Sequence, residues 1–291
     1  MLSILIPVYN YAIYSLVKTL HDQANKENID FEIIVLDDCS TDTNIITENE
    51  KACLLKNVRL LNNDSNLGRT LTRKKLAEAA WYTTLLFLDA DVKPVHDTFI
   101  KNYIAIPHKP VVLGGIVYTP ESLQKGKELR YKYGRLREQK TAAERSIYPY
   151  RNVLSANMLI DKTVFLDNNY SESNSLYGLD IYFSYNLIKH KIPVLHIDNP
   201  VYHLGLENND VFFNKALLAV KTRWQLLGGN NYDDANGMLK VYRKLKKYGL
   251  TGIVSFFFKI TSPVLKKLIL RKDPSLFCLD VYRLGYLCSL K

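Results

Sequence analysis

The sequence predicts an α/β fold with a mostly parallel, doubly wound sheet, followed by a helical and basic C-terminal extension. Apolar runs of strand length alternate with segments of helical periodicity, and this alternation is typical of such sheets. Two of the apolar runs end on neighbouring carboxylates, at Asp37-Asp38 and at Asp89-Ala90-Asp91. The last quarter of the chain is rich in Lys and Arg and poor in acids, which indicates a separate role for it.

Four strands and the helices between them are expected in the first half of the sheet domain. The strands are apolar runs bounded by polar residues, at 2–8, 31–36, 58–61 and 85–88. The helices are expected at 13–24, 42–55, 68–80 and 97–105. Asp42, Thr43 and Asn44 supply N-cap chemistry at the start of the second helix.

The pattern continues less regularly to about residue 210. Further strands are expected at 111–117, within 152–160, at 193–197 and at 201–204, and helices at 121–140, 181–190 and 211–227. The expected organisation is a domain over residues 1–210, with halves at about 1–110 and 111–210, and an extension over 211–291.

Composition and missing motifs exclude several classes of protein. Among the 291 residues, 47% are hydrophobic and 23% charged, which is ordinary for a soluble globular chain. The first apolar run is too short for a signal peptide, and no apolar stretch reaches about 18 residues, so no membrane-spanning helix is expected. The four cysteines lack C-x-x-C spacing, which argues against a zinc site. No G-x-G-x-x-G follows the first strand, which argues against a nicotinamide dehydrogenase.

The carboxylates of Asp89 and Asp91 are the most informative pair in the sequence. Charges do not remain inside a sheet without partners, so this pair is expected where the strand emerges from it. Two such carboxylates can hold a hard divalent cation that keeps its other positions for water and phosphate oxygens. Asp38 ends another strand at the same edge, where sheets of this kind bind ligands. The alternative is an ordinary acidic turn at a strand end.

Seven short motifs, in order over about residues 1 to 210, resemble those of family 2 glycosyltransferases of the GT-A fold. The likeness is to bacterial enzymes that build surface polysaccharides. The motifs are Ile6-Pro7-Val8-Tyr9-Asn10, Val35-Leu36-Asp37-Asp38-Cys39-Ser40-Thr41-Asp42, Asn66-Leu67-Gly68 with Arg73, Leu86-Phe87-Leu88-Asp89-Ala90-Asp91, Gly114-Gly115, Ser155-Ala156-Asn157 and Tyr177-Gly178-Leu179-Asp180.

The resemblance implies a nucleotide-diphospho-sugar donor, a UDP-sugar above all, bound by the first half of the domain. Pro7 would belong to the nucleotide and donor site, Tyr9 would lie against the base, and Asp38 would accept the uracil N3–H. The Arg73 guanidinium would face the diphosphate, which suits its forked geometry, and Gly115 would allow close approach of the donor. The alternatives are a core aromatic at Tyr9, an acidic turn at Asp38, a solvated helix face at Arg73 and a plain tight turn at Gly115.

The resemblance also implies a bound Mn²⁺ or Mg²⁺. Asp91 would be its main ligand, Asp89 would lie close to the ribose or the metal, and His203, just past a short strand, would complete the site. Imidazole is an acceptable ligand there. The alternative for His203 is a hydrogen-bonded structural residue, which is also the interpretation given to His196.

Asp180 is the expected general base, again by resemblance. Asn157, Tyr177 and Gly178 would contact the acceptor, in the second half of the domain. The family usually has Glu-Asp after Tyr-Gly-x, whereas this chain has a single acid. Phe183 follows Asp180 by three positions, as an aromatic or apolar residue commonly follows the catalytic Asp, so a one-residue deletion is placed before Asp180. The lost Glu would normally help to hold the acceptor or orient the base.

The function expected from these features is inverting transfer of a sugar to a glycan or lipid-linked glycan acceptor. Two rivals stay open. One is a GT-A-fold binding or scaffold protein that lost catalysis with the missing Glu and binds nucleotide without turnover. The other is a nucleotidyltransferase, which shares the sheet and the metal-binding carboxylates and releases pyrophosphate instead of a nucleoside diphosphate.

The net charge of +10 lies wholly in the extension, which indicates an anionic partner. From Phe212 onward the chain has 15 basic and 4 acidic residues, against 24 and 25 before it. Apolar and basic residues mix over residues 238–272, so this segment is expected either to lie on an anionic membrane or to pack as a helical hairpin with a solvated basic face. The sequence has no nucleic-acid-binding motif, and nucleic acid is not expected as a partner. The expected location is cytoplasmic, with peripheral attachment to the inner face of the membrane.

Overall fold

The structure is a computed structural model that describes residues 1–172, 176–227 and 237–290, and it divides into two compact units. The first unit consists of Met1–Val117, Lys140–Ser175 and Lys189–Gly205. The second consists of Tyr118–Gln139, Leu176–Ile188 and Leu206–Lys291. This division differs from the expected boundary at residue 210, because two earlier segments belong to the second unit.

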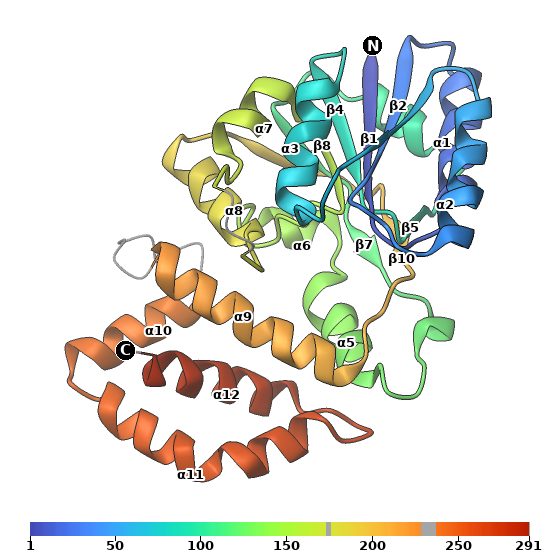
Figure 1. The fold of residues 1–291 in the computed structure, drawn as a ribbon. Coiled ribbons are helices and arrows are strands. Elements are labelled where there is room, and N and C mark those ends of the chain that lie inside the picture. Colours follow the sequence, from blue (N-terminus) through green and yellow to red (C-terminus); the bar gives the residue numbers. More distant parts are fainter. Residues whose placement is uncertain (173–175, 228–236, 291) are drawn as a thin grey trace. The chain divides into compact units, whose positions relative to one another are not determined.

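The first unit is built on a seven-stranded sheet whose order is β3-β2-β1-β4-β8-β6-β9 (Figure 1). Its strands are β1 (Leu2–Val8), β2 (Phe31–Asp37), β3 (Val58–Asn62), β4 (Thr84–Leu88), β6 (Val111–Leu113), β8 (Asn157–Asp161) and β9 (Val194–His196). Only β8 runs antiparallel to its neighbours, β4 and β6. The mostly parallel α/β fold is therefore confirmed, with the four N-terminal strands where the apolar runs predicted them.

Helices α1 and α3 lie on different sides of this sheet (Figure 1), and α1 packs against α4 whereas α3 packs against α7. The helices and short helical turns of the unit are α1 (Tyr14–Lys26), α2 (Thr43–Glu50), η1 (Lys51–Leu54), α3 (Arg69–Ala79), α4 (Phe99–Ile104), α6 (Ala142–Ser146) and α7 (Lys162–Asn168). The Asp42 side chain accepts hydrogen bonds from the backbone N–H groups of Asn44 and Ile45, which confirms the predicted N-cap.

A second, three-stranded sheet in the same unit has the order β5-β10-β7. Its strands are β5 (Val92–Pro94), β7 (Ile116–Val117) and β10 (Val201–His203). The single strand expected at 111–117 is wrong, because the chain leaves the large sheet after β6 and enters the small one at β7. Gly115 makes this turn with a φ of +90°, a backbone conformation that residues with a Cβ rarely adopt.

The second unit is helical. It contains η2 (Pro120–Ser122), α5 (Glu128–Tyr133), the π-helical turn η3 (Gly134–Glu138), α8 (Asp180–Lys189), α9 (Asn209–Leu227), α10 (Gly237–Lys247), α11 (Thr251–Ile269) and α12 (Leu276–Ser289). Helix α12 packs against both α9 and α11. The helical C-terminal region expected from the sequence is present, although its last helix, α12, was not anticipated.

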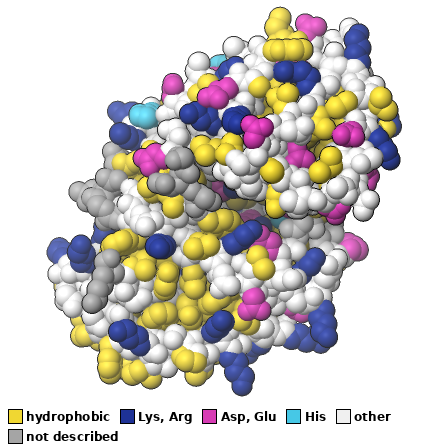
Figure 2. Space-filling model, viewed as in Figure 1, with side chains coloured by type: hydrophobic (Ala, Val, Ile, Leu, Met, Phe, Trp, Pro, Cys, Tyr) yellow, Lys and Arg dark blue, Asp and Glu magenta, His cyan; other side chains and the backbone are white. Residues whose placement is uncertain are grey.

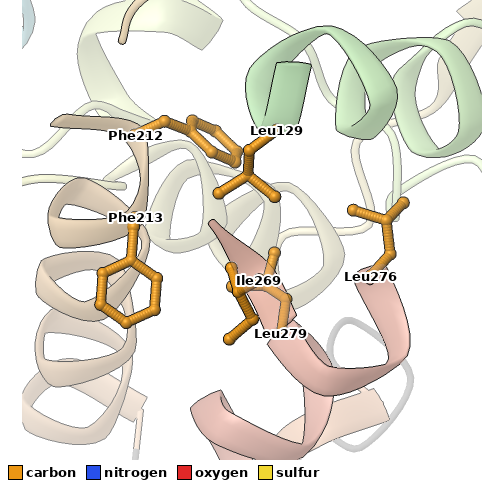
Figure 3. Packing of buried hydrophobic residues seen from close by; sticks show 6 residues of the cluster. All are labelled: Leu129, Phe212, Phe213, Ile269, Leu276 and Leu279. Atoms are coloured by element: carbon orange, nitrogen blue, oxygen red, sulfur yellow. The ribbon is translucent and has the colours of Figure 1, made fainter. Parts of the chain in front are cut away.

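Buried side chains explain why the earlier segments belong to this unit. Leu129 of α5 packs in one cluster with side chains of α9, α11 and α12, namely Phe212, Phe213, Ile269, Leu276 and Leu279 (Figure 3). Tyr185 of α8 packs in a second cluster with Val220, Leu227, Leu239 and Leu287. Apolar burial is the dominant favourable term in folding, so these contacts tie 118–139 and 176–188 to the C-terminal helices.

Candidate active site

The sheet edge beyond β4 brings Asp91 and His203 together, as the sequence predicted. Asp91 follows β4 and directly precedes β5, which pairs with β10 so that Val92 lies opposite His203. The Leu204 N–H donates to the Asp91 carbonyl at 2.8 Å. As a result, His203 Nε2 lies 3.5 Å from Asp91 Oδ2.

Asp89 faces two arginines of α3 instead. Its Oδ1 accepts a hydrogen bond from Arg73 Nη2 at 2.5 Å, and its Oδ2 accepts one from Arg69 Nη1 at 3.2 Å. Burial alone would raise the pKa of Asp89, but the charges of Arg73 and Arg69 outweigh it and hold that pKa below its usual range. Asp89 is therefore an ionised partner of α3, and it pairs with both Arg73 and Arg69.

The pKa of Asp91, in contrast, is raised above its usual range. Burial is the largest cause, the His203 imidazole opposes the shift, and the Asp89 charge adds to it. The Tyr11 hydroxyl lies near enough for the Asp91 charge to raise its pKa further, in addition to the effect of burial. Sequence reasoning missed Tyr11, and its only signal was its position two residues after the Tyr9 of the first motif.

The donors present fit a divalent cation at Asp91. A carboxylate oxygen and an imidazole nitrogen are accepted by Mn²⁺, and Mg²⁺ is commonly held by one or two carboxylates together with substrate phosphates. In the described residues, no group of three or more His, Cys, Asp or Glu side chains forms a ready metal site. The structure thus offers Asp91 and His203 as a two-donor set. Asp89 pairs with Arg73 and Arg69, and its expected place close to the ribose or the metal stays a prediction.

Gly205 is a further residue of this site that the sequence did not single out. A Cβ built on Gly205 would lie 2.1 Å from Asp91 Oδ2 and 2.8 Å from its Cγ. These distances are far inside van der Waals contact, so the absence of a side chain at 205 is what lets the Asp91 carboxylate occupy its position. A glycine two residues after the candidate ligand His203 was the signal available.

We expect Gly205→Ala to displace the Asp91 carboxylate and to weaken metal-dependent nucleotide binding at least tenfold. The measurement is a thermal-shift titration of nucleotide with Mn²⁺ and with EDTA. Gly252→Ala is the matched control, because a Cβ at that helical position would meet no atom within 4 Å apart from its chain neighbours and the nearby backbone of its own helix. A Gly205→Ala protein that keeps the wild-type difference between Mn²⁺ and EDTA would contradict this role.

The ends of β1 and β2 carry the residues expected at the nucleotide base. Pro7 lies in β1 opposite Leu36 of β2, and Tyr9 follows the strand as a half-exposed ring. Asp38 is buried, and its carboxylate accepts hydrogen bonds from the N–H groups of Leu67 and Gly68 at 2.9 and 2.8 Å. Asp38 therefore holds the loop before α3, while its contact with a base stays a prediction.

Arg73 is buried, and its second partner is Ser155. Besides Asp89, the Arg73 guanidinium donates to the Ser155 hydroxyl at 2.5 Å and to its carbonyl at 2.8 Å. The guanidinium thus joins α3 to the segment before β8. A direct contact with diphosphate stays a prediction, and it requires this network to rearrange.

Gly115 and Asn157 belong to a packed network inside the first unit. Asn157 is fully buried; its amide oxygen accepts from the Tyr103 hydroxyl at 2.7 Å, and its Nδ2 donates to the carbonyls of Gly115 and Asn199. The Arg145 guanidinium would lie 2.8 Å from a Cβ at Gly115. The space beside both residues is filled by protein, so the expected donor and acceptor contacts at these positions stay predictions that need this network to open.

His196 has the structural role that the sequence indicated. One ring nitrogen lies 3.0 Å from Arg145 Nη1 and the other lies 2.9 Å from the Pro149 carbonyl. The Arg145 guanidinium also donates to the carbonyls of Leu113 and Ile197. Arg145 was not anticipated, and it closes the end of the large sheet by binding carbonyls that leave their strands there.

In the second unit, Asp180 is the first residue of α8, three residues after a half-exposed Tyr177. The Tyr177 ring receives a cation–π contact from Lys215, whose Nζ lies 5.4 Å from the ring centroid. Gly178 adopts a φ of +83°. Burial lowers the pKa of Arg223 in α9, with Arg283 adding to the effect and Tyr133 and Asp180 opposing it. Arg223 is therefore close enough to Asp180 for their charges to interact, and the sequence did not reveal this neighbour.

Comparison with known proteins supports the interpretation of these motifs. Residues 3–159 match the family model described as Glycosyl transferase family 2. The chain resembles S. aureus TarS 1–349, solved in complex with UDP-GlcNAc, with a TM-score of 0.52 and 16% identity, over 98% of this chain and 90% of that one. It also resembles the mannosyltransferase PcManGT from Pyrobaculum calidifontis, solved with GDP-Man and Mn²⁺, with a TM-score of 0.60 and 13% identity, over 98% and 85%.

At these identities the structural likeness establishes the fold alone, an α/β fold with a mostly parallel sheet and a C-terminal helical region. No curated protein matches the chain at a significant level. The family model covers more than half of the chain and includes the β1, β2 and β4 ends described above, and on that evidence the chain belongs to glycosyl transferase family 2, with the GT-A fold.

Proposed function

We propose that this protein is an inverting glycosyltransferase that moves a sugar from a UDP-sugar to a glycan or lipid-linked glycan acceptor in bacterial surface polysaccharide synthesis. The observation that carries the proposal is the pair of Asp91 and His203 at the β4 edge of a family 2 domain, 3.5 Å apart. Of the structures it resembles, TarS was solved with UDP-GlcNAc and PcManGT with GDP-Man and Mn²⁺, so nucleotide-sugars are the donor class to test.

In this proposal some residues bind the cation or the base, and others hold those residues in position. Asp91 and His203 would hold a divalent cation, which would neutralise the diphosphate of the leaving group. The ion pairs of Asp89 with Arg73 and Arg69 fix the segment between β4 and β5, and so fix the position from which Asp91 projects. Tyr9, exposed after β1, offers its ring face to the base.

Asp180 would accept the proton of the acceptor hydroxyl as that oxygen attacks the anomeric carbon. A carboxylate is a suitable general base for such a step. Asp180 is the first residue of α8, and Arg223 of α9 lies near enough for its charge to interact with that of Asp180. The bond from the anomeric carbon to the diphosphate oxygen breaks as the new glycosidic bond forms, and the nucleoside diphosphate leaves.

The experiment that tests the donor class is a thermal-shift panel of UDP, GDP, CDP, TDP and their common sugar conjugates, each with Mn²⁺ and with EDTA. A ligand at about 100 times its dissociation constant stabilises the folded state by roughly 2.7 kcal/mol, which such a panel detects. We expect a shift with uridine nucleotides that requires Mn²⁺. A shift confined to another base would overturn the UDP assignment, and the absence of any nucleotide shift would contradict the proposal.

A further inference from the structure

Helix α11 has an apolar face that packs inside the second unit. The Phe258 ring meets the Tyr282 ring of α12 edge to face, with centroids 4.8 Å apart. Gly285 of α12 permits this contact, because a Cβ there would lie 2.5 Å from Phe258 Cδ2. Ile269 near the end of α11 is fully buried in the cluster with Leu279. This face provides the attachment of α11 to its own unit.

A second apolar face of the same helix is exposed. Its members are between 54% and 62% exposed, and they are Ile253, Phe256, Phe257, Ile260 and Val264. Their spacing of three, one, three and four residues places them in one stripe along an α-helix, distinct from the face that includes Phe258 and Ile269. The helix continues through Pro263, which has no N–H to donate to the Lys259 carbonyl, and that carbonyl accepts a hydrogen bond from the Ser262 hydroxyl instead. We call this stripe, from Ile253 to Val264, the α11 stripe.

The surroundings of the α11 stripe are basic. From Gly237 to Lys272 the chain has ten Lys and Arg residues and no Asp or Glu. The exposed lysines of α10 are Lys240, Lys244, Lys246 and Lys247, and those of α11 are Lys259, Lys266 and Lys267. The segment that joins the two helices exposes Tyr248 and Leu250. Figure 2 shows hydrophobic and basic side chains interspersed over the face of the helical unit that is in view.

We propose that α10 and α11 form a docking surface for an anionic phospholipid bilayer. The α11 stripe would enter the interfacial region of the lipid, and the lysines of α10 and α11 would contact lipid phosphates. Exposed apolar side chains framed by basic ones are the composition that interfacial helices use. This inference is independent of the proposed sugar transfer, because none of its residues belongs to the candidate active site.

In this proposal α10 and α11 lie along the bilayer surface. Within the part of the chain that the structure describes, no single helix is long and apolar enough to cross a bilayer. In those same residues α10 and α11 pass such a test when they are taken together, but the two helices are bent by 117° at the break between them and do not form one straight span. A second copy of this surface is disfavoured as the occupant, since it would bring the same acid-free basic segment opposite itself. Nucleic acid would use the lysines but would leave the aromatic and aliphatic stripe in water.

The test is co-sedimentation of the full chain with vesicles. We expect binding to vesicles of phosphatidylglycerol and phosphatidylcholine to be at least tenfold tighter than to phosphatidylcholine alone, and to weaken as salt rises from 0.1 to 0.5 M. Phe256→Ser with Phe257→Ser should weaken binding to the anionic vesicles at least tenfold. The matched control is Leu54→Ser with Leu123→Ser, which removes two exposed apolar side chains that belong to neither α10 nor α11.

A charge variant provides an independent arm. Lys240→Gln with Lys244→Gln should weaken binding to anionic vesicles and flatten its salt dependence, whereas Lys101→Gln with Lys125→Gln should do neither. In the Phe256→Ser, Phe257→Ser protein, the nucleotide thermal shift should be unchanged, which separates this surface from the donor site.

Three outcomes would overturn the proposal. The first is no sedimentation with anionic vesicles, and the second is equal binding by the Phe256→Ser, Phe257→Ser protein and its control. The third is a concentration-dependent dimer in analytical ultracentrifugation that this variant abolishes, since the stripe would then be an interface between copies of the chain.

Discussion

Replacing Asp180 by Asn is expected to lower kcat about a thousandfold while leaving the nucleotide thermal shift within experimental error of wild type. The substitution keeps the size of the side chain and its place at the start of α8, but it removes the carboxylate that would take the acceptor proton. Loss of a general base typically costs between about a hundredfold and ten thousandfold in rate. The measurement is nucleoside diphosphate release under saturating donor, with the thermal shift as the second readout.

The control for this experiment is Asp210→Asn. Asp210 lies in the first turn of α9, so its carboxylate has the same relation to a helix N-terminus that Asp180 has in α8. Any loss from helix-terminus electrostatics alone is a few tenths to about 1 kcal/mol and would appear in both variants. Full turnover by the Asp180→Asn protein would remove Asp180 from the role of base and leave the single-acid motif without a catalytic function.

Replacing Asp91 by Asn is expected to abolish the difference between Mn²⁺ and EDTA in the nucleotide thermal shift, and with it transfer. Asp91 is the carboxylate at the β4 edge that has an imidazole beside it, whereas Asp89 already binds two guanidinium groups. An amide oxygen carries no charge, so it binds a divalent cation more weakly than a carboxylate does. The exposed Asp97, just beyond β5, provides the control substitution Asp97→Asn.

Asp89→Asn helps to distinguish loss of the cation site from a general loss of stability. It would remove the negative charge that faces the buried Arg73 guanidinium, and breaking a buried ion pair in this way costs about 3 to 5 kcal/mol. We therefore expect Asp89→Asn to lower the free energy of unfolding without any ligand, and Asp91→Asn to leave it nearly unchanged. If Asp91→Asn kept a metal-dependent shift of wild-type size, the cation site would have to be placed elsewhere.

The sequence predicted those parts of the site that depend on local patterns, and it missed those that depend on contacts between distant segments. Asp38 and Asp91 were placed correctly at one sheet edge, because the ends of parallel strands are determined by local apolar runs and by their alternation with helices. His203 was expected beside Asp91 from the family resemblance, and the pairing of β5 with β10 is what brings the two residues together. Strand β5 itself was missed, since Val92-Lys93-Pro94 is too short and too polar to be recognised as a strand.

Features that depend on distant packing were not visible in the sequence. The contact of Arg73 with Asp89 and Ser155 depends on how α3 lies against the β4 end, and no local pattern encodes that orientation. For the same reason the sequence did not show that Arg73 and Asn157 are buried among protein partners, and their expected contacts with the diphosphate and the acceptor stay predictions. The sequence also did not assign residues 118–139 and 176–188 to the helical unit. Leu129 and Tyr185 are apolar residues in short helices, and only the assembled clusters show which side chains they pack against.

The proposed reaction transfers a sugar and releases a nucleoside diphosphate, so its products distinguish it from both rival functions. We would analyse the products by chromatography after incubating the full chain with UDP-sugars, Mn²⁺ and a bacterial glycolipid extract as acceptor. We expect UDP to appear with wild type, to require Mn²⁺, and to fall to background with Asp180→Asn. Pyrophosphate in place of UDP would identify a nucleotidyltransferase, and nucleotide binding without any UDP release would identify a protein that binds donors and does not turn them over.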